Sequence, residues 1–272
     1  MAIITISRQV AAHGDEVAQI LARNLGYTFI TRKEIEKRIV ELGFSESKLA
    51  KFDEKKPSFF ASLTKGRDEY FNYVQYAILE AAEKRNVVII GRGAFAILDN
   101  VPNHIAVRLI ADDKIRIKRL NNEFNWDEKK SLQRIQESDE NRAGFHRSFY
   151  NIDINDASLY HAVLNTGKLP LENCAKIISD IAETQITVQQ EEDGNFMIEK
   201  LLKAQSIVNK LYFEKCVNID FMHVSIEGKT ILLHGVSDSP VVVESALQVI
   251  RNEMPEYEVK SAVSIVHDFK TF

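Results

Sequence analysis

Cysteine and long hydrophobic runs are both scarce in this sequence. Only two of the 272 residues are cysteine, and Cys174 and Cys216 lie far apart and outside any metal-ligand spacing. We therefore expect two buried, reduced thiols rather than a disulfide or a metal site. No apolar run approaches the roughly 20 residues of a membrane helix, and no basic segment with a hydrophobic leader opens the chain. These features predict a cytoplasmic protein without membrane contact.

Positive charge is scarce toward the C-terminal end. Residues 191–272 hold 13 acidic and 8 basic side chains, whereas the preceding residues hold 26 acidic and 27 basic ones. An acidic segment is poorly suited to nucleic acid or to an anionic membrane surface. We therefore expect no nucleic-acid partner, and any anion-binding site should lie in the N-terminal part.

The first loop has no lysine and only one glycine, Gly14, although a phosphate site would need a lysine and several glycines. A strand pattern at Ile3–Ile6 is followed by a loop of small residues and a helix, an order that directs the first N–H groups of the helix at a phosphate. The pattern G-x-x-x-x-G-K-[ST] requires a lysine and a hydroxyl, and counted from Arg8 those places hold Gly14 and Asp15. The loss of one such donor typically costs roughly 10²–10³ in rate.

The same loop departs from a phosphate loop in other ways. Ala11 and Ala12 stand where glycines usually let the backbone curl around a phosphate, and their Cβ atoms restrict such conformations. Asp15 and Glu16 suit the positive end of the helix dipole, but they would also repel a triphosphate. His13 either donates one hydrogen bond to a ligand or is incidental.

Strand and helix patterns alternate up to about residue 187. Val87–Ile90 is a continuous apolar run, typical of a central parallel strand that is covered on both faces. The alternation predicts an α/β domain, with a parallel sheet flanked by helices and ligands at the carboxyl ends of the strands. Ser7-Arg8 and Gly91-Arg92-Gly93 should then lie at one edge of the sheet.

Hydrophobic periodicity predicts the other elements of this domain. We expect strands at 27–30, 104–110 and 161–164. We expect helices at 17–25, 32–42, 67–85, 112–120, 127–142 and 171–187, and an exposed connection at 46–56.

A polar stretch at 189–195, which contains Gly194, predicts a domain boundary. We divide the chain into domains 1–190 and 191–272. The second domain should be a small α+β unit of order αββαβ, with a helix at 197–211, strands at 222–226 and 231–233, a helix at 242–250 and a strand at 259–265. His223, His234 and His267 are too scattered in the sequence to predict a metal site.

Four groups of residues follow one another along the first part of the chain: Ile4-Thr5-Ile6-Ser7-Arg8, Val88-Ile89-Ile90-Gly91-Arg92-Gly93-Ala94, the ordered set Arg116, Arg119, Arg134, Asp139 and Arg142, and His161-Ala162-Val163-Leu164-Asn165-Thr166. In these groups and their order, residues 1–187 resemble the cytidylate-kinase-like branch of the nucleoside monophosphate kinases. The resemblance implies a P-loop NTPase-type fold and phosphoryl transfer from ATP or another nucleoside triphosphate, with Mg²⁺, to a nucleoside monophosphate. The implied partner is therefore a nucleotide or another phosphate-bearing small molecule.

The resemblance also implies roles for single residues. Arg92 would hold the acceptor phosphate, while Arg119 and Arg142 would cover the transferred group, because the planar guanidinium binds phosphate oxygens in pairs. Each arginine has an alternative: Arg92 a structural ion pair, Arg119 a solvated helix residue, and Arg142 an ion pair with Asp139. The donor nucleotide would lie against the loop residues Arg8, Ala11, Ala12, His13 and Gly14.

The C-terminal unit resembles a BON-like domain in the order of its strands and helices. Three functions stay open: an active kinase, a catalytically inactive nucleotide or phosphate sensor that signals through the C-terminal domain, and an assembly protein whose site has decayed. The apolar face of the helix at 67–85, through Phe71 and Ile78, could pack against a second copy to form a homodimer.

Overall fold

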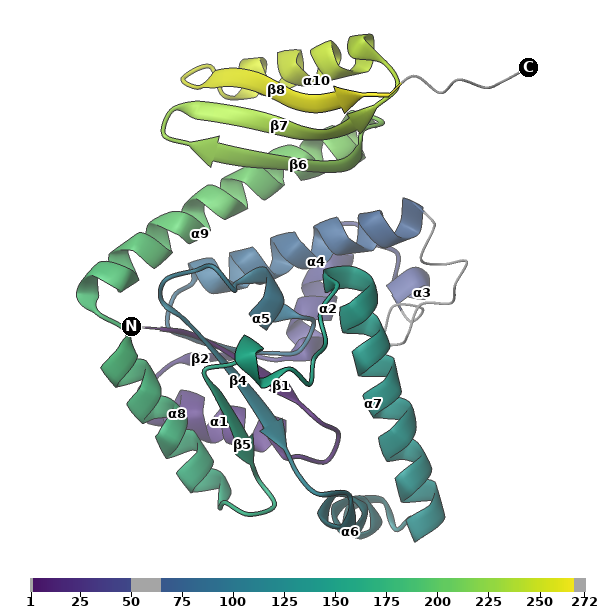
Figure 1. The fold of residues 1–272 in the computed structure, drawn as a ribbon, viewed down its shortest axis with the longest axis vertical. Helices are drawn as coiled ribbons and strands as arrows, with labels where there is room; N and C mark the ends of the chain where they lie inside the picture. Colours follow the sequence, from purple (N-terminus) through teal and green to yellow (C-terminus); the bar gives the residue numbers. More distant parts are fainter. Residues whose placement is uncertain (1, 50–64, 267–272) are drawn as a thin grey trace. The chain divides into compact units, whose positions relative to one another are not determined.

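The computed structural model of the protein describes residues 2–49 and 65–266 (Figure 1). Its contacts divide the chain into two compact units, Met1–Phe196 and Met197–Phe272. The predicted boundary near residue 190 therefore falls close to this division, and the exact extent of the two domains stays a prediction. Among the described residues, no helix is long and apolar enough to span a bilayer.

The first unit is built on a five-stranded parallel sheet, as the sequence predicts. The strand order is β2-β3-β1-β4-β5, so β1 lies in the centre, with β3 and β4 as parallel neighbours. The isoleucines of β1 are almost fully buried because helices cover both faces of the sheet. The strands are β1 (Ile3–Arg8), β2 (Thr28–Ile30), β3 (Val87–Ile90), β4 (His104–Ile110) and β5 (Ala162–Asn165).

Helices α1 and α8 lie on one side of this sheet, and α4 and α5 lie on the other (Figure 1). The first side holds an apolar core to which α1, α8 and alternate residues of β1, β3 and β4 contribute. Thr31 and Glu34 form the capping box at the start of α2. The helices of the unit are α1 (Gly14–Leu25), α2 (Arg32–Glu41), α3 (Glu46–Leu49), α4 (Lys65–Glu83), α5 (Ala94–Ile97), α6 (Asp113–Phe124), α7 (Glu128–Tyr150) and α8 (Leu171–Gln185), with a 3₁₀ turn at Ala157–Leu159.

Three local predictions in this unit are corrected. The expected connection at 46–56 begins with the helix α3, and its remainder lies outside the described residues. Helix α7 continues past Arg142 to Tyr150, because Phe145 and Phe149 extend its buried face by one helical repeat. The predicted apolar face of α4 is covered within its own chain: Ile78 is fully buried, and the ring of Phe71 stacks on Phe149. This face therefore gives no support to the predicted homodimer.

The polar stretch at 189–195 is helical, not a break. It belongs to α9 (Val188–Asn209), whose start is capped by Thr187 and Gln190: each side chain accepts the backbone N–H of the other residue. This Thr-x-x-Gln capping box is a sequence signal that the polar composition obscured. Gly194 serves close packing rather than flexibility, since a Cβ there would lie 2.0 Å from Oδ1 of Asn103.

The second unit has the predicted αββαβ order. After α9 and a short π-helical turn (Lys210–Glu214) come β6 (Asp220–Glu227), β7 (Thr230–Ser237), α10 (Pro240–Glu253) and β8 (Glu258–Ile265). The hairpin β6-β7 is antiparallel, and β7 pairs in parallel with β8. The second unit has an apolar core of its own, which contains Ile231, Leu233 and Ile250.

The structure also corrects part of the predictions about the cysteines and the histidines. Both cysteines are free thiols, but only Cys174 is buried; Cys216 is exposed. His223 and His234 face each other across β6 and β7, with ring centroids 4.3 Å apart, so they are not scattered in space. His267 lies outside the described residues. Among those residues, no group of three or more side chains could hold a metal ion.

Candidate functional site

A pocket of about 360 Å³ lies where β1 ends and α1 begins. Its volume is within the range of small-ligand sites, about 300–1,000 Å³. Six of the eight predicted site residues line it: Arg8, Ala11, His13 and Gly14 from the loop, Arg119 from α6 and Arg142 from α7. Ala12 and Arg92 do not line this pocket.

The loop curls in the way that glycines would allow, although it contains alanines. Ala11 and His13 both have left-handed backbones, with φ of 56° and 52°. This conformation costs an L-residue roughly 1–2 kcal/mol, so it persists only where surrounding contacts hold it. Ala12 is fully buried, and its carbonyl accepts a hydrogen bond of 2.9 Å from the Thr166 hydroxyl. The Cβ atoms expected to restrict such conformations therefore do not prevent them here, because contacts from Arg119 and Thr166 hold the loop.

Gly14 is required for a close approach rather than for a left-handed backbone. A Cβ at this position would lie 2.6 Å from Cγ and 2.8 Å from Cβ of Arg8. The stem of Arg8 therefore lies directly against the start of α1. Gly14 stands in the place of the usual phosphate-loop lysine, and the nearby Arg8 brings a cation to the same pocket by a different route.

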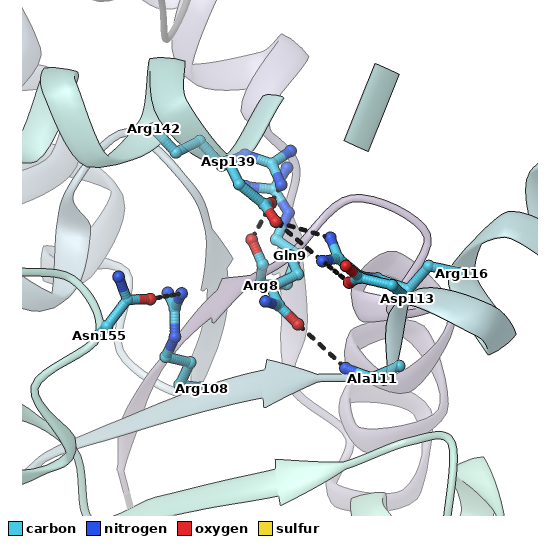
Figure 2. Close-up of polar contacts among 9 residues, drawn as sticks. All are labelled: Arg8, Gln9, Arg108, Ala111, Asp113, Arg116, Asp139, Arg142 and Asn155. Atoms are coloured by element: carbon cyan, nitrogen blue, oxygen red, sulfur yellow. Dashed lines mark hydrogen bonds and ion pairs between the residues drawn. The ribbon is translucent and has the colours of Figure 1, made fainter. Parts of the chain in front are cut away.

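Two further arginines hold the loop from outside. Arg119 donates to the Ala11 carbonyl (2.9 Å) and to both the hydroxyl and the carbonyl of Thr166 (3.0 and 2.7 Å). Burial lowers the pKa of Arg119, and the charge of Glu16 opposes that effect. Arg142 donates to the carbonyl of Arg8 at 3.0 Å (Figure 2). Arg119 and Arg142, which the resemblance implies would cover the transferred group, thus both bond to backbone carbonyls of the loop.

Arg116 of α6 and Arg134 of α7, the other two arginines of the ordered set, differ in their surroundings. Arg116 is buried and pairs with Asp113 at 2.5 Å and with Asp139 at 2.9 Å (Figure 2). It therefore joins α6 to α7 and is not a solvated residue. Arg134 lies exposed on α7.

Arg92 is buried and forms an ion pair with the half-buried Glu36. Only 1% of the surface of Arg92 is exposed; its guanidinium pairs with Glu36 of α2 and donates to the Tyr70 hydroxyl at 3.0 Å. Burial alone would raise the pKa of Glu36, but the charges of Arg92 and Arg32 outweigh this and lower it. The structure thus shows the ion pair that the sequence left as the alternative, and a role of Arg92 in binding an acceptor phosphate stays a prediction.

The turns after β1 and β3 do converge, as predicted. The Gly91 N–H donates to the Ile6 carbonyl at 3.3 Å, and a second, narrow pocket is lined by Ser7 and Arg8 from one turn and by Gly91 and Gly93 from the other. Its volume is only about 10 Å³, close to what a single water occupies.

Arg108 was missed by the sequence reasoning. It is 6% exposed on β4 beside Ser7, and it donates to the Ser7 hydroxyl at 3.0 Å and to Oδ1 of Asn155 at 2.9 Å (Figure 2). The signal was a single charge inside the apolar run Ile105–Ile110. The sequence also did not predict that Glu123 and Phe124, at the end of α6, would line the larger pocket.

A central parallel strand followed by a curled loop and a helix is the arrangement of a P-loop-type fold, and here arginines gather around that loop. The chain belongs to the cytidylate kinase-like family, which its sequence matches over residues 3–168. Residues from 169 onward, including the whole second unit, lie outside that match.

Known relatives agree with this assignment. The chain is similar to the cytidylate kinase of Pyrobaculum islandicum, with 26% identity over 66% of this chain and 92% of the relative. It is also similar to that of Methanocaldococcus jannaschii, with 30% identity over 57% of this chain and 89% of the relative. A crystal structure of an uncharacterized protein from Eubacterium ventriosum is similar to 67% of this chain and 98% of its own, with 25% identity and a TM-score of 0.53.

Proposed function

We propose that the first unit is a nucleoside monophosphate kinase-like phosphotransferase, which binds a nucleoside triphosphate in the larger pocket. The observation that carries the proposal is the pocket itself, because one cavity combines the start of α1 with Arg8, Arg119 and Arg142. Phosphoryl transfer depends mainly on positioning and on positive charge around the transferred group, and this cavity offers both. The relatives named cytidylate kinase support the same reaction class.

The residues of the pocket also fit a Mg²⁺-bound triphosphate. Mg²⁺ is usually bound by one or two carboxylates together with substrate phosphates, and Asp15 and Glu16 line the cavity beside the loop. When bound, the ion would neutralise phosphate charge that these carboxylates alone would repel. In this chain the backbone from Ala11 to Gly14 would bind the phosphates, while Arg119 and Arg142 would keep the loop curled and add positive charge.

A second candidate is a catalytically inactive nucleotide sensor that signals through the C-terminal, BON-like unit. Two observations favour it. Gly14 occupies the lysine position of the loop, and Arg92, which would hold the acceptor, is buried against Glu36 and the Tyr70 hydroxyl. Such a protein would bind the triphosphate but would not transfer its phosphoryl group.

Calorimetry with MgATP tests the binding step. We expect Arg119→Ala to weaken MgATP binding at least about tenfold, because a charge-assisted bond to phosphate is lost together with one bond to the loop, at Ala11, and two bonds to Thr166. Arg134→Ala removes an exposed arginine from α7 and should leave the affinity unchanged. An unchanged affinity in Arg119→Ala would contradict the site assignment.

A coupled ADP-release assay with CMP, dCMP and UMP tests the transfer step. Turnover with any of these acceptors supports the kinase. Binding of MgATP without turnover supports the sensor, and no binding of MgATP, ATP or CTP would contradict both.

A further inference from the structure

Phe124 is an exposed aromatic residue placed at the edge of the larger pocket. It ends α6, 49% of its surface is exposed, and it lines the same cavity as Arg8 and Arg119. A single exposed apolar side chain is ordinary on a protein surface, but one that borders an arginine-lined pocket offers a ligand an apolar face.

The ring of Phe124 is held in place by its neighbours. It stacks on the Trp126 ring with centroids 4.7 Å apart and an interplanar angle of 25°. The Lys130 ammonium lies 4.6 Å from the centroid of that indole ring. Such stacking fixes the orientation of Phe124 before a ligand arrives, which reduces the entropy lost on binding.

The positions of Arg119 and Phe124 on one helix give the pocket two ends. Arg119 bonds to the Ala11 carbonyl and so marks the phosphate end, whereas Phe124 lies five residues further along α6, about 7.5 Å along the helix axis. A nucleotide whose phosphates rest on the loop would therefore carry its base toward the Phe124 end of the cavity.

We propose that Phe124, supported by Trp126, is the platform on which the base of the bound nucleoside triphosphate stacks. This rests on the proposed function, because it concerns the ligand of the same pocket. Every nucleobase has a π face, so a stacking platform tolerates different bases and prefers those that stack more strongly. We expect ATP, GTP and CTP all to bind, and we expect ATP and GTP, which carry the larger purines, to bind more tightly than CTP.

Paired titrations with MgATP and with Mg²⁺-tripolyphosphate distinguish the contribution of the base to affinity from that of the phosphates. Phe124→Ala should weaken MgATP binding about 5- to 150-fold, the range measured when a stacking aromatic is truncated, and should leave the binding of Mg²⁺-tripolyphosphate unchanged. Phe124→Tyr keeps the aromatic face and should bind MgATP like the wild type. Phe221→Ala removes another exposed phenylalanine, located in the second unit, and is the matched control that should change neither affinity.

Trp126 gives an independent readout because it is the single tryptophan of the chain. Saturating MgATP should change its emission in the wild type, and the change should be smaller in Phe124→Ala. Unchanged emission in the wild type would overturn the platform.

The possible failures are distinguishable. The platform is overturned, and the proposed function stands, if Phe124→Ala binds MgATP as tightly as the wild type. The same holds if this variant loses affinity for MgATP and for Mg²⁺-tripolyphosphate to the same extent. If the wild type binds neither MgATP nor tripolyphosphate, the proposed function and the platform are overturned together.

Discussion

Buried arginines of the first unit are compensated in different ways. Arg92 pairs with the Glu36 carboxylate, which also pairs with Arg32 at 2.6 Å. Arg108 instead donates to two neutral groups, the Ser7 hydroxyl and the Asn155 amide oxygen. A buried cation is costly unless it is paired and hydrogen-bonded, so the pair with Glu36 explains how Arg92 can be almost fully buried. The ion pair joins α2 to the turn after β3.

His104 gives the first unit a pH-dependent stability. Its side chain is buried on β4 and shares a hydrogen bond of 2.7 Å with the Thr5 hydroxyl. Burial, with a smaller contribution from the charge of His161, lowers the pKa of His104 to about 3. Between pH 6.5 and about 3 the unfolded chain therefore binds a proton at this residue that the folded chain does not bind.

We expect the free energy of unfolding to fall as the pH falls through this window. The contribution of His104 is about 1.4 kcal/mol per pH unit, or roughly 2 kcal/mol between pH 6.5 and 5. His104→Asn cannot take up this proton, so urea unfolding should show a shallower decline for the variant. If the free energy of unfolding fell equally with pH in both proteins, the low pKa assigned to His104 would be contradicted, because all other titrating groups are common to both.

Residue identity predicted the site only in part. Arg8, Ala11, His13, Gly14, Arg119 and Arg142 meet in one pocket because each follows or faces the carboxyl end of a predicted parallel strand. Arg92 has the same sequence context and yet points to Glu36, since the choice between a ligand and an ion pair depends on which carboxylate the tertiary fold brings near. No local pattern encodes that choice.

At the scale of elements, the loop between β1 and α1 is held by contacts distant in sequence. Arg119 and Thr166 bond to the carbonyls of Ala11 and Ala12, and Arg142 bonds to that of Arg8. These bonds stabilise left-handed backbones at Ala11 and His13 that local propensity disfavours. The loop is therefore shaped from α6, α7 and the end of β5 as much as by its own sequence.

Gly14→Ala tests how closely α1 approaches Arg8. The added Cβ would lie 2.6 Å from Cγ of Arg8, so we expect a loss of about 1–3 kcal/mol in the free energy of unfolding and weaker MgATP binding. Ala11→Gly is the matched control because it removes one methyl group from the same loop, at a left-handed residue where glycine is not strained. It should not reduce stability. Equal stability of Gly14→Ala and the wild type in urea unfolding would contradict the contact.

Helix α9 shows how composition can mislead about an element. The residues at 189–195 are polar, yet the Thr187–Gln190 capping box starts a helix that runs to Asn209. Polar residues favour a loop only where the backbone has no better partner for its N–H groups, and here the cap supplies that partner.

At the scale of the whole molecule, each unit has a hydrophobic core of its own. Ile231, fully buried on β7, tests whether the two units act separately. Ile231→Ala should destabilise the second unit by about 2–5 kcal/mol, because it leaves a cavity in that core, and should leave MgATP affinity unchanged. Calorimetric melting and titration would measure both. A changed affinity would show that the second unit is coupled to the pocket, as the sensor hypothesis requires.

The sequence by itself determined the parallel sheet, the αββαβ order of the second unit and the edge at which the site lies. These depend on hydrophobic periodicity and on the rule that parallel strands end on one side, and both are local or topological. Only the tertiary structure decided which arginines reach the pocket, that Arg92 is paired with Glu36, and that Phe124 borders the cavity. Those outcomes depend on contacts between residues distant in the chain, where burial and the nearest opposite charge fix the orientation of each side chain.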